Sequence, residues 1–241
     1  MLQDATAPDY SIVIPMMNEA GNVLPLADAV ADAMQGHDYE LILVDDASRD
    51  TTVSEMQQAK AAHPRIRIIR HAENRGQSRG LLTGIQAARG AWIITLDGDM
   101  QNPPSEIPKL IAIAPHDMHG AVCGIRVKRQ DTGARRWASR WANNIRRSIL
   151  NDDCPDTGCS LKMFPRETFL RLPYFDHMHR YLPVLFKLYG LPLSYVNVAH
   201  QPRTVGVSKY SNWQRALVGI TDLIGVRWLQ RRTRIVKSWE D

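Results

Sequence analysis

The chain has 241 residues with a formal net charge of +5, and 44% of them are apolar. This length suits one large domain, alone or with a short appendage, and the apolar share can build a sizeable core. The modest basic excess favours an acidic partner, such as a phosphorylated substrate, an anionic membrane or a nucleic acid. Three cysteines are too few for a disulfide framework, which predicts a reducing compartment.

Neither a secretion signal nor a membrane span is visible in the sequence. Residues 1–4 lack the basic region and apolar core of a signal peptide. No apolar run reaches the roughly 18 residues that a transmembrane helix needs. We therefore expect no transmembrane helix.

Short apolar runs alternate with helical patterns in the first half. We expect strands at residues 11–14, 39–44, 65–70 and 91–96. We expect helices at residues 18–33, 50–62, 77–88 and 105–114, the first two capped by Asn18 and Asp50. A strand spacing of about 30 residues is typical of βαβ units. The sequence therefore predicts an α/β fold with a Rossmann-like, mostly parallel sheet flanked by helices.

The second half has a different pattern. We expect strands at residues 120–127, 159–164 and 193–200, and helices at 131–150, 179–189 and 212–230. The helix at 131–150 carries five arginines and places Trp137 and Trp141 one turn apart. This basic helix is either a solvated face or a surface for phosphates and membranes. The last helix is either an amphipathic helix on an anionic leaflet or a docking helix of the domain.

Polar clusters follow the predicted strands, at residues 15–19, 45–50, 74–80 and 97–101. The carboxyl ends of parallel strands meet at one edge of a sheet, where ligands bind. Asp45 could accept a hydrogen bond from a nucleobase, and Glu19 and Asp46 could hold ribose hydroxyls or neighbouring loops. Turn and cap chemistry is the alternative for Asp46 and Asp50. Gly76 and Gly80 resemble a phosphate loop only weakly, and close packing of a helix on the sheet is an equal explanation for both.

Asp97 and Asp99 flank Gly98 directly after the apolar run at residues 91–96. Gly98 lets the chain turn, so that both carboxylates can face one ion. Such hard oxygen ligands suit Mg²⁺ or Mn²⁺ held together with substrate phosphates. A plain surface turn is the alternative for this triplet taken alone.

Several motifs, in order, resemble those of the family 2 glycosyltransferases, most of all the polyprenyl-phosphate branch that includes dolichyl-phosphate mannosyltransferase. In the first half they are IPMMNE (14–19), VDDASRD (44–50), NRG (74–76) and LDGDMQNPP (96–104). In the second half they are GIRVKRQD (124–131), SR (139–140) with Asn143, DTGCSLK (156–162), HRYLP (179–183) and RTVGVSKY (203–210). The resemblance covers roughly residues 10 to 215.

This resemblance implies a GT-A fold, a Mg²⁺ or Mn²⁺ cofactor and an inverting transfer of a sugar from a nucleotide-sugar to a polyprenyl phosphate. The implied metal ligands are Asp97, Asp99 and Gln101. The candidate donor-binding residues are Pro15, Asn18, Glu19, Asp45, Asp46, Gly76, Asp97, Gln101 and Ser208. The candidates for holding the acceptor phosphate are Arg126, Arg136, Ser139 and Arg140. The candidate catalytic residues are Asp97, Asp99, Arg126, Arg203 and Lys209.

The chemistry of this reaction is compatible with these residue types. The diphosphate leaving group gains negative charge, which a metal on Asp99, together with Arg203 and Lys209, would stabilise. The acceptor phosphate is already anionic and needs no strong general base. His179 is the nearest candidate for a catalytic histidine, and we expect a structural role for it. Asp156 either positions the acceptor or braces its loop.

Members of this branch often continue into C-terminal transmembrane hairpins, which the sequence does not show. We expect residues 1–210 to form the catalytic domain and residues 211–241 to form an amphipathic, basic interfacial helix. The expected location is the cytoplasmic face of a bacterial plasma membrane, as a peripheral enzyme. A small membrane-protein partner in place of the hairpins is a further hypothesis.

Two other functions stay open. A family 2 transferase acting on a carbohydrate or protein hydroxyl would need a general base, and Asp156 is the only loop carboxylate that we can nominate. A non-catalytic binder of membranes or nucleic acid would use the basic helices. The acidic loops would repel phosphates without a metal, so we expect no nucleic-acid partner.

Overall fold

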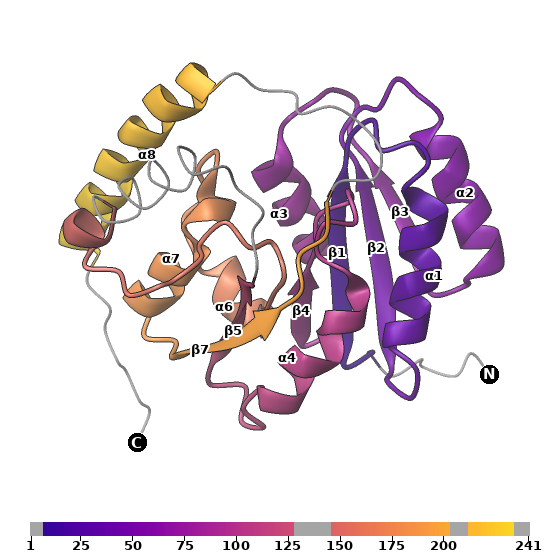
Figure 1. Ribbon diagram of the computed structural model, residues 1–241, viewed down its shortest axis with the longest axis horizontal. Helices are drawn as coiled ribbons and strands as arrows, with labels where there is room; N and C mark the ends of the chain where they lie inside the picture. The colour runs from indigo at the N-terminus through magenta and orange to yellow at the C-terminus, as the bar shows by residue number, and fades with distance from the viewer. Residues whose placement is uncertain (1–6, 128–145, 203–211, 234–241) are drawn as a thin grey trace.

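The computed structural model describes residues 7–127, 146–202 and 212–233, with side chains in the last range from residue 219 onward. A seven-stranded sheet in the order β3-β2-β1-β4-β6-β5-β7 forms the centre of this described part (Figure 1). The strands are β1 (Tyr10–Met16), β2 (Tyr39–Asp45), β3 (Ile66–Arg70), β4 (Trp92–Thr95), β5 (Ala121–Arg126), β6 (Lys162–Pro165) and β7 (Leu193–Val198).

Most neighbouring strands of this sheet run parallel. β1 pairs in parallel with β2 and β4, β2 pairs in parallel with β3, and β5 pairs in parallel with β7. β6 runs antiparallel to both β4 and β5. The predicted α/β fold with a mostly parallel sheet is therefore confirmed.

Helices cover both faces of the sheet. The longer ones are α1 (Val23–Ala33), α2 (Thr52–Ala62), α3 (Gln77–Ala87), α4 (Ile107–Ile113), α7 (Leu182–Leu188) and α8 (Asn212–Arg232). The shorter ones are η1 (Pro104–Glu106), α6 (Arg166–Leu170) and η2 (Met178–Arg180). In Figure 1, α1 and α2 lie side by side at one end of the molecule, and α7 and α8 lie at the other.

The core is divided in two by the sheet, because alternate side chains of a strand point to opposite faces. Ile12 and Ile14 of β1 pack with residues of α1, α2 and α4. Val13, between them, packs with residues of α3, α6, α7 and α8. α8 belongs to this second cluster through Leu223 and Val226, which are both buried.

Two glycines bring α3 close to β1. A Cβ atom at Gly80 would lie 2.8 Å from Cβ of Pro15, and one at Gly84 would lie 2.4 Å from Cγ1 of Val13. Such distances are too short for non-bonded carbon atoms. Close packing is therefore the correct explanation for Gly80, and it sets the first turn of α3 beside the end of β1.

Some predicted boundaries are wrong. Asn18 does not cap α1, which begins at Val23. Instead, Asn18 adopts a φ of 50° and its Oδ1 accepts a hydrogen bond from the backbone N–H of Arg49 at 2.7 Å. The predicted helix at 179–189 is split into η2 and α7, because Pro183 starts a new first turn. The predicted strand at 159–164 begins at Lys162. Most of the predicted helix at 131–150 lies outside the described residues. Its described part, residues 146–150, is helical.

Candidate active site

Asp97 lies at the carboxyl end of β4, in the middle of the sheet. Its Oδ1 accepts a hydrogen bond from Nε2 of Gln77 at 2.6 Å. Burial, and then the nearby negative charge of Asp99, raise the pKa of the Asp97 carboxyl to about 6. The charge of Asp99 thus disfavours the ionisation of Asp97, and a divalent cation at this turn would favour it.

Asp99 and Gln101 belong to the same tight turn as Asp97. Oδ1 of Asp99 accepts a hydrogen bond from the backbone N–H of Gln101 at 3.1 Å, and Met100 between them has a φ of 61°. A Cβ atom on Gly98 would lie 3.0 Å from Cε of Met16, so the methionine side chain would have to shift to admit one. The structure thus places the three predicted metal ligands on one turn at the edge of the sheet.

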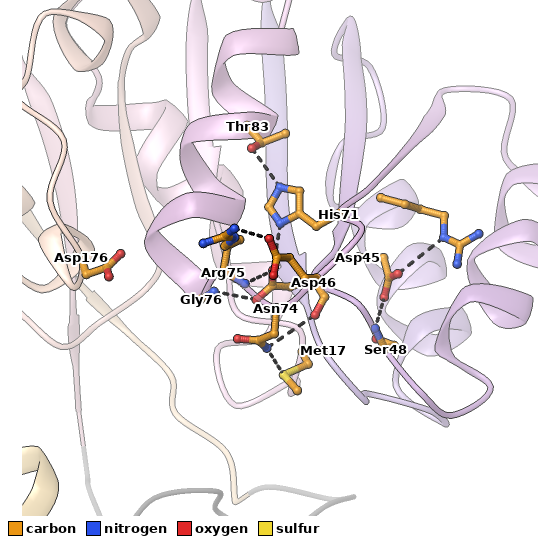
Figure 2. Close-up of polar contacts among 12 residues, drawn as sticks. Met17, Asp45, Asp46, Ser48, His71, Asn74, Arg75, Gly76, Thr83 and Asp176 are labelled. Atoms are coloured by element: carbon orange, nitrogen blue, oxygen red, sulfur yellow. Dashed lines mark hydrogen bonds and ion pairs between the residues drawn. The ribbon is translucent and has the colours of Figure 1, made fainter.

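The neighbouring strand end carries Asp45, whose side chain is 1% exposed. Its Oδ1 accepts a hydrogen bond from the backbone N–H of Ser48 at 3.0 Å. Its Oδ2 lies 3.6 Å from Nε of Arg70 but makes no hydrogen bond within the described residues. A cavity of about 630 Å³, lined by Ser48, Arg70 and Asn74 among others, lies at this end of β2 and β3. Figure 2 shows Asp45 with its Ser48 contact.

Asp46 holds the loop before α3 (Figure 2). Its Oδ1 accepts hydrogen bonds from the backbone N–H of Arg75 and from Nδ1 of His71, both at 2.8 Å. Its Oδ2 accepts one from the backbone N–H of Gly76 at 2.8 Å. Of the two roles left open for Asp46, the contacts support the neighbouring loop rather than a ribose. They also fix Gly76, whose φ is 82°, directly before α3.

The loop after β1 is bound to the loop after β2 in the same way, through hydrogen bonds between backbone N–H groups and side-chain oxygens. The backbone N–H of Glu19 donates to Oγ1 of Thr52 at 2.8 Å, and Oε2 of Glu19 accepts from Nδ2 of Asn22 at 3.0 Å. Asp50 accepts from the backbone N–H of Ala20 and of Thr52. Asp50 therefore carries out the turn chemistry that was its alternative role. Pro15 is buried in β1, against α3.

A second cavity, of about 350 Å³, lies on the other side of Asp97. Its polar lining includes Gln77, Asp97, Ser160, Lys162, His179 and Arg180. Lys162 is buried, and its Nζ donates hydrogen bonds to the carbonyl oxygens of Thr157 and Cys159. Sequence reasoning missed Lys162, Gln77 and Ser160. The only available signal was the membership of Lys162 and Ser160 in the motif DTGCSLK.

Arg126 is held in a fixed orientation beside this cavity. Its Nε and Nη2 donate to Oδ2 and Oδ1 of Asp156, both at 2.7 Å, and both side chains are nearly buried. This two-pronged contact is the strongest geometry for an arginine–carboxylate pair. Asp156 is thus a partner of Arg126 as well as a part of its loop.

Arg136, Ser139, Arg140, Arg203, Ser208 and Lys209 lie outside the described residues. Their roles stay predictions.

Comparison with known proteins decides the family. The family described as "Glycosyl transferase family 2" matches residues 11–172. The chain belongs to glycosyl transferase family 2. The match includes the strands that carry Asp45, Asp97 and Arg126.

Curated relatives of this family 2 glycosyltransferase match most of its length. Undecaprenyl-phosphate 4-deoxy-4-formamido-L-arabinose transferase of Shewanella sediminis is 35% identical over 205 residues, which are 83% of this chain and 61% of that protein. Dodecaprenyl-phosphate galacturonate synthase of Rhizobium johnstonii is 34% identical over 229 residues, which are 92% of this chain and 68% of that protein. The chain thus spans less than two thirds of the arabinose transferase.

Solved structures identify the fold of the transferase as GT-A. Glucosyl-3-phosphoglycerate synthase from Mycobacterium tuberculosis superposes with a TM-score of 0.70 at 16% identity, covering 92% of this chain and 80% of the other. The mannosyltransferase PcManGT from Pyrobaculum calidifontis, in complex with GDP-Man and Mn²⁺, gives 0.66 at 19% identity, covering 96% and 67%. The predicted GT-A fold is confirmed.

The acidic turn of the transferase fits a divalent metal. Within the described residues no three His, Cys, Asp or Glu side chains are grouped to hold an ion. Two carboxylates and the amide of Gln101 are nevertheless the kind of set that Mg²⁺ uses when substrate phosphates complete its shell. Burial first, and the negative charge of Asp99 second, raise the pKa of Asp97, so a cation at this turn would favour its ionised form.

Proposed function

We propose that this family 2 glycosyltransferase transfers a sugar, with inversion, from a nucleotide-sugar to a polyprenyl phosphate. The observation that carries the proposal is the pair of cavities on the two sides of the Asp97–Asp99 turn. The sheet order β3-β2-β1-β4-β6 places one cavity, the acidic turn and the other cavity in a row. A nucleoside, a diphosphate with its metal, and a sugar follow one another in the same order.

The cavity beside Asp45 is proposed to bind the nucleobase. The buried Oδ2 of Asp45 makes no hydrogen bond within the described residues, and an unsatisfied buried oxygen is unfavourable. A base N–H that reaches Oδ2 from this cavity, whose lining includes the Asp45 partners Ser48 and Arg70, would satisfy it. Asn18, Glu19 and Pro15 are proposed to shape the loops around the nucleoside.

The turn at Asp97, Asp99 and Gln101 is proposed to hold Mg²⁺ or Mn²⁺ with the donor diphosphate. A bound divalent ion supplies stabilisation of the negative charge that develops on the leaving group. Arg203, Ser208 and Lys209 remain proposed partners of the same diphosphate. Gln77 holds Asp97 by its 2.6 Å hydrogen bond, so the carboxylate is oriented before any ligand binds.

The acceptor phosphate is proposed to bind at Arg126, with Arg136, Ser139 and Arg140. Asp156 orients Arg126 and occupies both of its own oxygens in doing so. It is therefore poorly suited to serve as the general base that a hydroxyl acceptor would need. This favours a phosphate acceptor, which is already anionic. The two relatives above are named for transfer to polyprenyl phosphates, in agreement with this proposal.

α8 is proposed to rest on an anionic membrane surface, at the cytoplasmic face. Ile220, Ile224 and Trp228 recur every four residues and are 57%, 64% and 61% exposed. The opposite face of the helix is buried through Leu223 and Val226. Basic residues continue after Trp228, at Arg231 and Arg232. No helix in the described part of the chain is long and apolar enough to span a bilayer.

The experiment is an assay of the full chain with Mn²⁺ or Mg²⁺, a panel of UDP- and GDP-sugars, and undecaprenyl phosphate. Mass spectrometry of the lipid fraction identifies any lipid-linked sugar. The proposal expects one donor of the panel to give such a product only when the metal is present. A product on an added saccharide or peptide, with none on the lipid, would support a hydroxyl acceptor instead.

A further inference from the structure

His179 in η2 forms part of the wall of the 350 Å³ cavity beside Asp97. Its ring is hydrogen-bonded to Ser78 in the first turn of α3, although the two residues are 101 positions apart in the sequence. Nδ1 of His179 lies 2.8 Å from Oγ of Ser78, and the backbone N–H of His179 donates to the same oxygen at 3.3 Å. Ser78 is only 3% exposed. The imidazole is therefore held at one edge by a buried partner.

These two contacts bear on which ring nitrogen carries the proton, because a serine Oγ can donate one hydrogen bond and accept two. Oγ of Ser78 accepts the backbone N–H of His179, and its own hydroxyl hydrogen has no other acceptor among the described hydrogen bonds. A hydroxyl that gives this hydrogen to Nδ1 leaves Nδ1 as the unprotonated nitrogen of the ring. Nε2 then carries the hydrogen and is the donor at the opposite edge of the ring.

The imidazole is also neutral at physiological pH. Burial, together with the positive charges of Arg180 and Lys162 and with His177, lowers the pKa of His179 to about 3. A group with such a pKa is a poor proton acceptor near pH 7. This excludes His179 as a general base and leaves it as a neutral hydrogen-bond donor.

We propose that His179 selects the donor sugar by donating a hydrogen bond from Nε2–H to a hydroxyl or carbonyl oxygen of that sugar. The inference rests on the proposed function, which places the sugar in this cavity. A neutral donor suits an uncharged oxygen, whereas Lys162 and Arg180 on the same wall are charged. Because Ser78 holds the ring of His179 in place and its hydroxyl can donate to Nδ1, we assign Ser78 as a positioning residue.

α3 links this contact to the metal turn. Gln77 and Ser78 are consecutive residues of its first turn: Gln77 binds Asp97, and Ser78 binds His179. The helix start is itself held by Asp46 through the backbone of Arg75 and Gly76. One rigid helix end thus fixes the spacing between a metal ligand and the proposed sugar contact.

Two substitutions at position 179 distinguish the role of Nδ1 from the role of Nε2. His179→Asn keeps an amide near the Nδ1 position, where it can still bind Ser78, but it loses the donor at Nε2. His179→Gln keeps an N–H near the Nε2 position. Ser78→Ala removes the positioning contact alone. His177→Asn is the matched control, because His177 lies on the same turn but pairs with Asp222 of α8.

Calorimetry with Mn²⁺ measures the affinity of each variant for the best nucleotide-sugar and for its nucleoside diphosphate. His179→Asn is expected to weaken nucleotide-sugar binding by about tenfold, the effect of one hydrogen bond. It is expected to leave diphosphate binding as in the wild type. His179→Gln should stay closer to the wild type, Ser78→Ala should lie between the two, and the control should show no change. A deoxy donor that lacks the recognised oxygen should bind the wild type and His179→Asn equally.

The outcomes separate this inference from the function on which it rests. Equal nucleotide-sugar affinity in wild type and His179→Asn would overturn the role of His179 alone. An equal loss for nucleotide-sugar and diphosphate would also overturn it, by indicating a general disturbance of the site. If the wild type binds no nucleotide-sugar, the proposed function fails and the role of His179 fails with it. If donor binds but lipid is not glycosylated, only the proposed acceptor is refuted.

Discussion

Nε2 of Gln77 donates a 2.6 Å hydrogen bond to Oδ1 of Asp97, which joins the start of α3 to the acidic turn at the end of β4. Asp97 is thus oriented by a residue outside its own turn. Contacts of this kind commonly tune metal ligands, because they fix the direction of the carboxylate. The relationship makes the first turn of α3 part of the proposed active site.

Replacing Gln77 by alanine should weaken metal binding without unfolding the protein. The loss of a partner of a metal ligand is expected to lower Mn²⁺ affinity by about tenfold or more. The measurement is a Mn²⁺ titration in the presence of nucleoside diphosphate. Gln86→Ala is the control, since Gln86 is an exposed glutamine of the same helix. Unchanged affinity in Gln77→Ala would show that this contact does not support the metal turn.

Gly84→Ala should destabilise the protein. The added methyl would lie 2.4 Å from Cγ1 of Val13 and 3.0 Å from Cγ2 of Val44, so α3 would be pushed from the sheet. We expect a loss of about 1–3 kcal/mol in the free energy of unfolding, seen as a lower Tm. Gly225→Ala in α8 is the control: nothing lies within 4 Å of the new atom, and this change should be neutral or stabilising by up to about 1 kcal/mol. A Tm that falls equally in both variants contradicts the packing argument.

Arg126→Ala should raise the KM for the lipid phosphate more than the KM for the donor, because it removes a fixed cation from the proposed acceptor site. We expect an increase of about tenfold or more, since hydrogen bonds to charged groups are among the stronger ones. Steady-state kinetics with each substrate varied in turn makes the measurement. Asp156→Asn keeps the charge of Arg126 but weakens its orientation, so its effect should be smaller. A larger change in donor KM than in lipid KM rejects the acceptor role.

Trp228→Ser and Ile224→Ser should reduce binding to anionic lipid vesicles without lowering Tm, because both side chains are more than half exposed. Removing one large apolar side chain from a membrane contact is expected to weaken binding by about tenfold. Co-sedimentation with vesicles containing phosphatidylglycerol measures this. Ile113→Ser is the control, since Ile113 is exposed on α4. Equal vesicle binding by all three variants would argue against α8 as the membrane face.

The sequence is informative wherever the signal is local. The run from Ala91 to Leu96 predicts a buried strand, and the carboxylates that follow must then lie at the edge of the sheet. The same logic places Asp45 at the end of β2. The family motifs add the expected chemistry of these edges, and the GT-A fold agrees with them.

What could not be predicted depends on contacts between distant segments. Nothing near Ser78 in the sequence indicates His179, and nothing near Gln77 indicates Asp97, because the fold alone brings these pairs together. Asparagine is a favourable helix-capping residue. In this fold, however, the loop after β2 holds Asn18, whose Oδ1 accepts a hydrogen bond from the backbone N–H of Arg49 instead. The antiparallel direction of β6 is likewise a property of the whole fold and has no local signal in the sequence. The division at residue 210 and the membrane-protein partner stay predictions.

The central claim is tested most directly by lipid glycosylation in wild type and Asp99→Asn. The measurement is mass spectrometry of undecaprenyl phosphate after incubation with Mn²⁺ and the active nucleotide-sugar. The account predicts a lipid-linked sugar for the wild type and a rate at least about a hundredfold lower for Asp99→Asn, with the Tm of the two proteins alike. Turnover of Asp99→Asn at near the wild-type rate, or a wild type that transfers no sugar to the lipid from any donor, would contradict it.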